Sequence, residues 1–153
     1  MNKSAIVADI LEKLRAEFDS RHATSKQARA TGNDAETKAE GKYDTRSTEE
    51  NYLADGLAKQ ALAAMQAAAA FEKLPARDFS PGDLIDVGAV IELEFPASHE
   101  WFFLAPAAGG IEIEHDGHII TVITPASPLG CQLIGKKAGD STTAPATRIV
   151  AVH

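Results

Sequence analysis

Proline and glycine divide this 153-residue chain into two parts of different character. No proline occurs before Pro75, whereas seven prolines and eight of the eleven glycines lie from that residue onward, among many β-branched residues. Because proline interrupts helices and glycine favours turns, only the first part is free to form long helices. The sequence therefore predicts an α+β protein, with a helical domain over residues 1–75 and a β-rich domain over residues 76–153.

The first helix is expected from about residue 4 to residue 31. Ser4 can cap its start, and apolar residues then recur every three to four positions, which places them on one helix face. This face consists of Ile6, Ile10, Leu11, Leu14 and Phe18. The sequence after Phe18 is polar but contains no helix breaker, so the helix is expected to continue in a solvated form.

A second helix is expected from a capping box at residues 47–50 to Leu74, where Pro75 stops it. Its larger apolar residues mark the side expected to be buried: Tyr52, Leu53, Leu57, Leu62, Met65 and Phe71. Alanines fill residues 61–70 and would let another helix approach closely. The two helices are therefore expected to form an antiparallel coiled-coil hairpin.

The far end of this hairpin, at about residues 33–46, is polar and carries four carboxylates among basic residues. These carboxylates are Asp34, Glu36, Glu40 and Asp44. One interpretation is a solvated loop with ion pairs between residues four apart. The other is a cluster that reaches a divalent cation held elsewhere, because Mg²⁺ binds one or two carboxylates together with water and substrate oxygens. The composition leaves both interpretations open.

The second part is expected to form a strongly bent antiparallel sheet around one short helix. Strands are expected over residues 87–95, 101–104, 111–115, 118–123 and 148–152. Asp116-Gly117 is a strong signal for a two-residue hairpin turn. In the short helix, Ser127 is the expected N-cap, Pro128 the first residue and Gly135 the left-handed end.

Several classes of site find no support in the residues. A single cysteine, Cys131, excludes an internal disulfide and a zinc site of several thiolates, and it is expected to be buried. His115 and His118, with Asp116 between them, make an incomplete metal site, so a solvent-facing pair is expected. No nucleotide-binding glycine loop and no Ser/His/Asp arrangement occurs. The chain is therefore not expected to be an enzyme or to carry a cofactor of its own.

The negative charge lies mainly in the second part. Residues 76–153 carry 10 acidic and 4 basic side chains, whereas residues 1–75 carry 12 and 11. This acidity opposes direct binding to nucleic-acid phosphates. No stretch approaches the roughly 20 apolar residues of a membrane span, and the start lacks the apolar run of a secretion signal. A cytoplasmic monomer without membrane contact is expected.

The segment Ser127–Asp140 resembles a signature of the Gre family of bacterial transcription elongation factors. That signature has Ser-Pro, a short helix, Leu-Ile-Gly-Lys and then Gly-Asp, and the same order and spacing occur here in Ser127-Pro128, 133–136 and Gly139-Asp140. A weaker similarity covers residues 28–43, at the hairpin tip. Members of the family have an N-terminal coiled coil and a C-terminal FKBP-like domain, so the resemblance covers nearly the whole chain.

The resemblance implies that bacterial RNA polymerase is the partner and that nucleic acid is reached only through it. The C-terminal domain would dock at the rim of the secondary channel, and the coiled coil would enter the channel. The residues implied in polymerase binding are Ser127, Pro128, Leu129, Leu133, Gly135 and Lys136. In the family, tip carboxylates help to hold a second Mg²⁺ of the polymerase and a water that cleaves backtracked RNA. The tip candidates here are Asp34, Glu36, Glu40 and Asp44, with Glu36 and Glu40 as metal ligands only within the polymerase complex.

The tip departs from the family's pattern, which has two carboxylates three positions apart. Aligning on Tyr43 places Glu36 at the first position and Ala39 at the second, and Glu40 is one residue away, which is about 100° on a helix. If the alignment is anchored on Gly32 instead of Tyr43, Asp34 can take the place of a tip carboxylate. Polymerase binding therefore follows more directly from the resemblance than RNA cleavage does, and the chain looks like a shorter Gre-like relative.

Three other roles stay open at this stage. One is a polymerase regulator that does not stimulate cleavage. A second is an FKBP-like peptidyl-prolyl isomerase, although fold alone does not determine function. The aromatic residues available to line its pocket are Phe79, Phe95, Trp101, Phe102 and Phe103. The third is a coiled-coil interaction module, which the alanine-rich residues 61–70 suggest.

Overall fold

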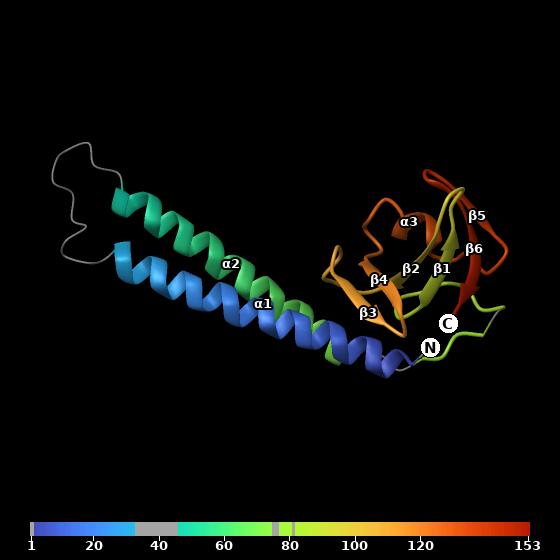
Figure 1. Ribbon diagram of the computed structural model, residues 1–153, viewed down its shortest axis with the longest axis horizontal. Coiled ribbons are helices and arrows are strands. Elements are labelled where there is room, and N and C mark those ends of the chain that lie inside the picture. Colours follow the sequence, from blue (N-terminus) through green and yellow to red (C-terminus); the bar gives the residue numbers. More distant parts are fainter. Residues whose placement is uncertain (1, 33–45, 75–76, 81) are drawn as a thin grey trace. The chain divides into compact units, whose positions relative to one another are not determined.

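A computed structural model describes residues 2–32, 46–74, 77–80 and 82–153. In chain order its elements are α1 (Lys3–Gly32), α2 (Arg46–Glu72), β1 (Val90–Glu94), β2 (His99–Leu104), β3 (Glu112–His115), β4 (His118–Ile123), α3 (Gly130–Leu133), β5 (Ser141–Thr143) and β6 (Ala146–Val152). The predicted α+β class is confirmed, with a helical hairpin followed by a sheet and one short helix (Figure 1). Within the described ranges, no helix combines the length and apolar character that crossing a membrane requires.

The described residues fold into two compact units. One unit comprises the chain up to Leu11 together with Ala69–His153, and the other is Glu12–Ala68. The first turns of α1 and the last residues of α2 therefore belong to the unit that contains the sheet. The predicted boundary between residues 75 and 76 falls on residues outside the described part and stays a prediction.

The first helix extends to Gly32, close to the expected end, but its cap differs from the expected one. The Asn2 side-chain Oδ1 accepts a hydrogen bond from the Ala5 N–H at 3.3 Å, so Asn2 caps the helix. Ser4 lies inside the helix, which begins at Lys3. The expectation for Ser4 is therefore wrong, and asparagine is as good an N-cap as serine.

The second helix covers most of the expected range. It begins at Arg46, one residue before Ser47 of the predicted capping box, and ends at Glu72, two residues before Leu74. The side chains of residues 46–51 lie outside the described part, so the capping box itself stays a prediction. The Leu74 N–H donates to the Phe71 carbonyl at 3.0 Å, which tightens the chain into a turn after the helix.

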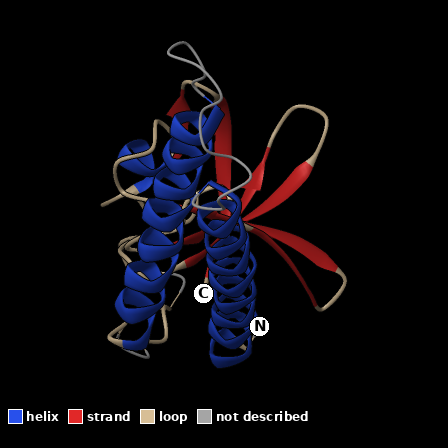
Figure 2. Cartoon of the chain, turned by 90° about the vertical axis from the view of Figure 1, so that its left-hand side faces the viewer, coloured by secondary structure: helices blue, strands red, loops and turns tan. Residues whose placement is uncertain are grey.

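The hairpin seam, defined by Ala54, Ala61, Ala64 and Ala67 of α2, is built from small side chains. These alanines are at most 7% exposed, and α1 runs beside α2 (Figures 1 and 2). On α1, Leu14 and Ser25 are buried, and the Ser25 hydroxyl donates to the Ala54 carbonyl at 2.8 Å. Alanine allows the two helix backbones to approach closely enough for this bond.

The expectation that the larger apolar residues form the buried side of α2 is wrong for four of the six. Tyr52, Leu53, Leu62 and Met65 are 49–74% exposed. Leu62 follows Ala61 by one residue, a rotation of about 100°, so burying the alanine turns the leucine away. Phe71 is 1% exposed, as expected.

The sheet has the strand order β3-β4-β2-β1-β6-β5. All neighbouring pairs are antiparallel except β2 and β4, which run parallel with Trp101 opposite Ile120. The expectation of a wholly antiparallel sheet is therefore corrected. The chain returns through β3 before it enters β4, so β4 starts at the same end of the sheet as β2. Strand β5, at Ser141–Thr143, was not expected.

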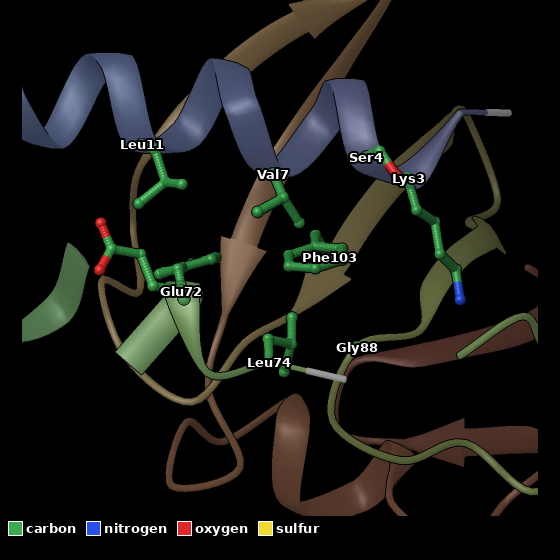
Figure 3. A pocket seen from close by; sticks show the side chains of 9 residues that line it. Lys3, Ser4, Val7, Leu11, Glu72, Leu74, Gly88 and Phe103 are labelled. Carbon is green, nitrogen blue, oxygen red and sulfur yellow. The ribbon is translucent and has the colours of Figure 1, made fainter. Parts of the chain in front are cut away.

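The two faces of the sheet have different neighbours. One face contributes to an apolar core of buried residues: Phe79, Ile85, Ala89, Ile91, Leu93, Phe102, Leu104, Ile123, Leu133, Ile149 and Val152. On the other face, the ring of Phe103 stacks on that of Phe71 with 6.2 Å between centroids. A cavity of about 300 Å³ lies beside Phe103, lined also by Val7, Leu11 and Leu74 (Figure 3).

Candidate functional site

The 127–136 segment contains the residues that the sequence implicates in partner binding. The Ser127 hydroxyl donates to the Thr124 carbonyl at 2.8 Å and accepts the Gly130 N–H at 3.0 Å, which is the side-chain bond expected of an N-cap. Pro128, the predicted first helical residue, lies in a turn, and the residue at the N-cap position of α3 is Leu129. The Cys131 N–H donates to the Ser127 carbonyl at 3.0 Å. Helix α3 itself is only Gly130–Leu133, shorter than expected, because the residues on either side form turns.

Two glycines fix the path of this segment. A Cβ on Gly130 would lie 2.0 Å from the Thr124 carbonyl oxygen, so a larger residue does not fit there without a shift of the backbone. Gly135 has φ +77°, which is the left-handed end that the sequence predicts. The segment is therefore a defined turn of backbone, held by its cap and by its two glycines.

The implicated side chains differ in what they can offer a partner. Pro128 and Gly135 are exposed, and Ser127, Leu129 and Lys136 are half-buried. Leu133 is 0% exposed and belongs to the apolar core. Its side chain therefore supports the segment from below and does not form part of the contact surface.

Gln132 connects the segment to the turn between β5 and β6. Its Nε2 donates to the Pro128 carbonyl at 3.1 Å and to the Ala144 carbonyl. Its Oε1 accepts the N–H groups of Thr143 and Ala144, each at 3.2 Å. One side chain thus joins the backbone of the segment to the backbone of the β5–β6 turn. No sequence signal pointed to Gln132, because its partners in that turn lie 11 and 12 residues away.

Cys131 does not take the buried position that was expected. It is exposed, and its Sγ donates to the Pro128 carbonyl at 3.2 Å. Position 131 lies on the outer side of the turn, whereas Leu133 on the inner side fills the core.

The two histidines of the β3–β4 hairpin lie in different surroundings, so the expected solvent-facing pair is wrong for His115. The His115 side chain is 12% exposed, and its Nδ1 lies 3.2 Å from Asp9 Oδ2 and its Nε2 3.4 Å from Asp116 Oδ2. His118 is exposed, and its ring centroid lies 4.9 Å from that of Trp101. The turn between them is as predicted, with φ of 52° at Asp116 and 76° at Gly117.

The described ranges contain no group of three or more His, Cys, Asp or Glu side chains arranged to hold a metal ion. The tip carboxylates Asp34, Glu36, Glu40 and Asp44 lie outside the described residues, so both interpretations of the tip stay predictions. A metal role for Glu36 and Glu40 inside a polymerase complex is likewise untested.

Among the described residues, two ionisable groups have clearly shifted pKa values, and both lie outside the 127–136 segment. Burial lowers the pKa of Lys3, although the neighbouring Asp78 opposes this shift. The Lys3 ammonium donates to the Arg77 carbonyl and lies 4.4 Å from the centroid of the Phe79 ring. Burial also lowers the pKa of His153.

Sequence reasoning also missed two exposed apolar residues, one at the end of the segment and one in a neighbouring loop. Leu84 is 56% exposed and Ile134 is 43% exposed, and both line the same hollow. Ile134 stands within the signature but was not singled out. The available signal for Leu84 was an apolar residue directly after the Gly82-Asp83 turn, next to an Ile85 that fills the core.

No protein-family model matches the chain, and no curated protein matches it. Among solved structures, the chain is similar to GreA factor homolog 1 (Gfh1) of Thermus thermophilus, with 20% identity, 94% of each chain covered and a TM-score of 0.35. It is also similar to Gfh1 of Thermus aquaticus, with 19% identity, 93% of this chain and 92% of that chain covered, and a TM-score of 0.36.

Proposed function

We propose that this chain is a Gre-like regulator that binds bacterial RNA polymerase at its secondary channel and is not itself an enzyme. The observation that carries the proposal is the 127–136 segment. Its residues resemble the family's signature, and its backbone is held in one conformation by Ser127, Gly130 and Gln132. A helical hairpin that precedes the sheet supports the same assignment, since such a hairpin is what would enter the channel.

Within the segment, the proposed contact residues are those that reach the surface. Pro128 and Gly135 are exposed, and Ser127, Leu129 and Lys136 are partly accessible. Leu133 positions them by anchoring α3 in the core. Because the backbone is fixed before binding, little conformational entropy is lost on docking.

A binding measurement with purified bacterial RNA polymerase tests this function. The unaltered chain is expected to bind, and Pro128→Glu is expected to weaken binding about tenfold by placing a charge in the contact surface. Pro106→Glu is the matched control, because Pro106 is another exposed proline, in the loop after β2. Failure of the unaltered chain to bind polymerase would refute the proposal.

Stimulation of RNA cleavage is a finer proposal that rests on the tip. Purified protein is added to a stalled, backtracked polymerase complex, and shortening of the RNA is followed. If Glu36 and Glu40 hold the second Mg²⁺ of the polymerase, Glu36→Ala and Glu40→Ala remove the shortening while leaving binding intact. If the unaltered chain binds and the RNA is not shortened, the chain is a regulator without cleavage.

Two rival functions are distinguished by simple measurements. An FKBP-like isomerase would accelerate proline isomerisation in a model peptide, and we expect no acceleration. A self-pairing coiled coil would use the exposed apolar residues of α2, such as Leu62 and Met65. Light scattering separates monomer from dimer, and a stable dimer through the hairpin would contradict entry into the channel.

A further inference from the structure

The cavity beside Phe103 lies within the unit that contains the sheet. It measures about 300 Å³, and its described lining comes from the first turns of α1, from the end of α2 and the residues after it, and from the sheet region (Figure 3). Most of that lining is apolar. The apolar side chains are Val7, Leu11, Phe71, Leu74 and Phe103. Because all of these residues belong to one compact unit, the fold of that unit forms the cavity.

The cavity is large enough for a small molecule and is accessible from solvent. Phe71 and Phe103 are at most 1% exposed, whereas Val7, Leu11 and Leu74 are half-buried, so the cavity reaches the surface. An apolar cavity of about 150 Å³ can bind benzene, so one of twice this volume can hold about ten to twelve non-hydrogen atoms. Contact with the apolar side chains removes hydrocarbon surface from water, which favours an aliphatic ligand.

The two ends of the cavity carry opposite charges. Lys3 and Ser4, in the first turn of α1, lie at one end, and Glu72 of α2 lies at the other (Figure 3). A carboxylate is repelled by Glu72 and attracted by the Lys3 ammonium. The Ser4 hydroxyl can in addition donate a hydrogen bond to it. A ligand with one carboxylate and one apolar chain therefore fits in a single orientation.

The surroundings of Lys3 favour an anion at this end. Burial lowers the pKa of Lys3, which means that the charged ammonium has lost part of its hydration. The charges of Asp78 and Arg77 act on this pKa in opposite directions and do not restore it. The ammonium donates to the Arg77 carbonyl, which uses one of its three N–H donors. The first turn of α1 has no acidic residue, so the positive end of the helix adds to the attraction.

We infer that this cavity is a binding site for a small aliphatic monocarboxylate. The chain of the ligand lies against Val7, Leu11 and Phe103, and its carboxylate accepts hydrogen bonds from the Lys3 ammonium and the Ser4 hydroxyl. The described lining includes no residue of the 127–136 segment. The inference therefore goes beyond the proposed function and does not depend on whether the chain binds polymerase.

The test is an NMR titration of the isotope-labelled full chain with octanoate. A dissociation constant of roughly 0.1–1 mM is expected for a ligand of this size. The backbone N–H signals of Val7, Gly88 and Phe103 should shift and saturate together, because these residues line the cavity. The signals of Ile119 and Val150, which are exposed elsewhere on the sheet, should not shift. Unmoved cavity signals, or equal shifts at Ile119 and Val150, would overturn the inference.

Filling the cavity tests where the aliphatic chain binds. Val7→Phe adds a ring to the lining and is expected to weaken octanoate binding about tenfold. Val150→Phe is the matched control, because Val150 is exposed on β6, and it should bind within about twofold of the unaltered chain. Circular dichroism and the thermal midpoint verify folding, and Leu11→Phe replaces Val7→Phe if that variant fails this check. Unchanged affinity in the folded variant would overturn the site.

A second arm tests the charge at the Lys3 end. Lys3→Gln keeps a donor for the Arg77 carbonyl but removes the positive charge, and it is expected to weaken octanoate binding about fivefold. Octanol has the same chain without the negative charge and should bind equally to both forms. Lys137→Gln changes an exposed lysine outside the cavity lining and should leave octanoate binding within about twofold. Equal losses of octanoate and octanol in Lys3→Gln, or equal affinities of the two ligands for the unaltered chain, would overturn the inference.

Discussion

The hairpin seam and the sheet core are buried by side chains of very different size. Ala54, Ala61 and Ala64 fill the seam, whereas the sheet core contains phenylalanines, leucines and isoleucines. Burial of a methyl group contributes about 0.8 kcal/mol, and burial of a whole leucine side chain contributes roughly 1.5–3 kcal/mol. The hairpin therefore depends on close approach of two backbones, and the sheet unit depends on apolar area. Substitutions should reveal this difference in unfolding free energy. Truncating a side chain should destabilise the sheet core, whereas enlarging a side chain should destabilise the seam.

The largest effect is expected when the sheet core loses a large side chain. Leu133→Ala is expected to cost about 3 kcal/mol of unfolding free energy, because Leu133 is 0% exposed and truncation leaves a cavity. Urea unfolding followed by the fluorescence of Trp101, the single tryptophan, measures the loss. Ile134→Ala is the neighbouring control and should change stability by less than about 0.5 kcal/mol. A loss below about 1 kcal/mol for Leu133→Ala would contradict its role in the core.

Enlarging a buried side chain of the seam should destabilise the hairpin, whereas truncating an exposed side chain of α2 should not. Ala61→Leu is expected to cost about 1–3 kcal/mol, because the added atoms separate two helices that meet through alanine. Leu62→Ala is expected to change stability by less than about 0.5 kcal/mol, since Leu62 is 49% exposed. Thermal unfolding followed by circular dichroism at the helix band compares the two. If Leu62→Ala lowered the stability more than Ala61→Leu, the larger residues and not the alanines would form the seam.

The buried polar contact of the hairpin should have a smaller effect. Ser25→Ala removes the hydrogen bond that the serine hydroxyl donates to the Ala54 carbonyl, which typically contributes about 1 kcal/mol. Ser20→Ala is the matched control on the same helix, because Ser20 is exposed. The same thermal measurement applies. Equal stability of the two variants would mean that the Ser25 bond makes no net contribution.

The features that the sequence predicted correctly are local ones. Asp116-Gly117 forms the expected turn because both residues tolerate positive φ, whatever surrounds them. Ser127 accepts the expected bond from Gly130, three residues later, and Gly135 takes the expected positive φ, because both features depend on the local backbone. Helix α1 also ends near the expected residue, because no breaker interrupts it.

The features that were missed depend on residues far apart in the chain. The His115 side chain is only 12% exposed, and its partner Asp9 lies 106 residues earlier in the chain. The parallel pairing of β2 with β4 depends on how the chain returns through β3. In α2, alanine and leucine positions were equally compatible with a helix, and only the approach of α1 decides which are buried. Of the candidate site, the turn at Ser127 was predictable from sequence, whereas the hollow of Leu84 and Ile134 needed the fold.

The smallest effect in the sheet unit should be a pH dependence from His153. Burial lowers the pKa of His153, so below the ordinary value of about 6.5 the unfolded chain binds more protons than the folded chain. Stability from this group is therefore complete above about pH 6.5 and decreases as the pH falls below that value. His153→Gln should flatten the decline in urea stability between pH 8 and pH 5.5, and the change should be small because the half-buried imidazole remains partly solvated. If the stability of the variant declines as steeply as that of the unaltered chain, protonation of other groups causes the loss of stability at acid pH.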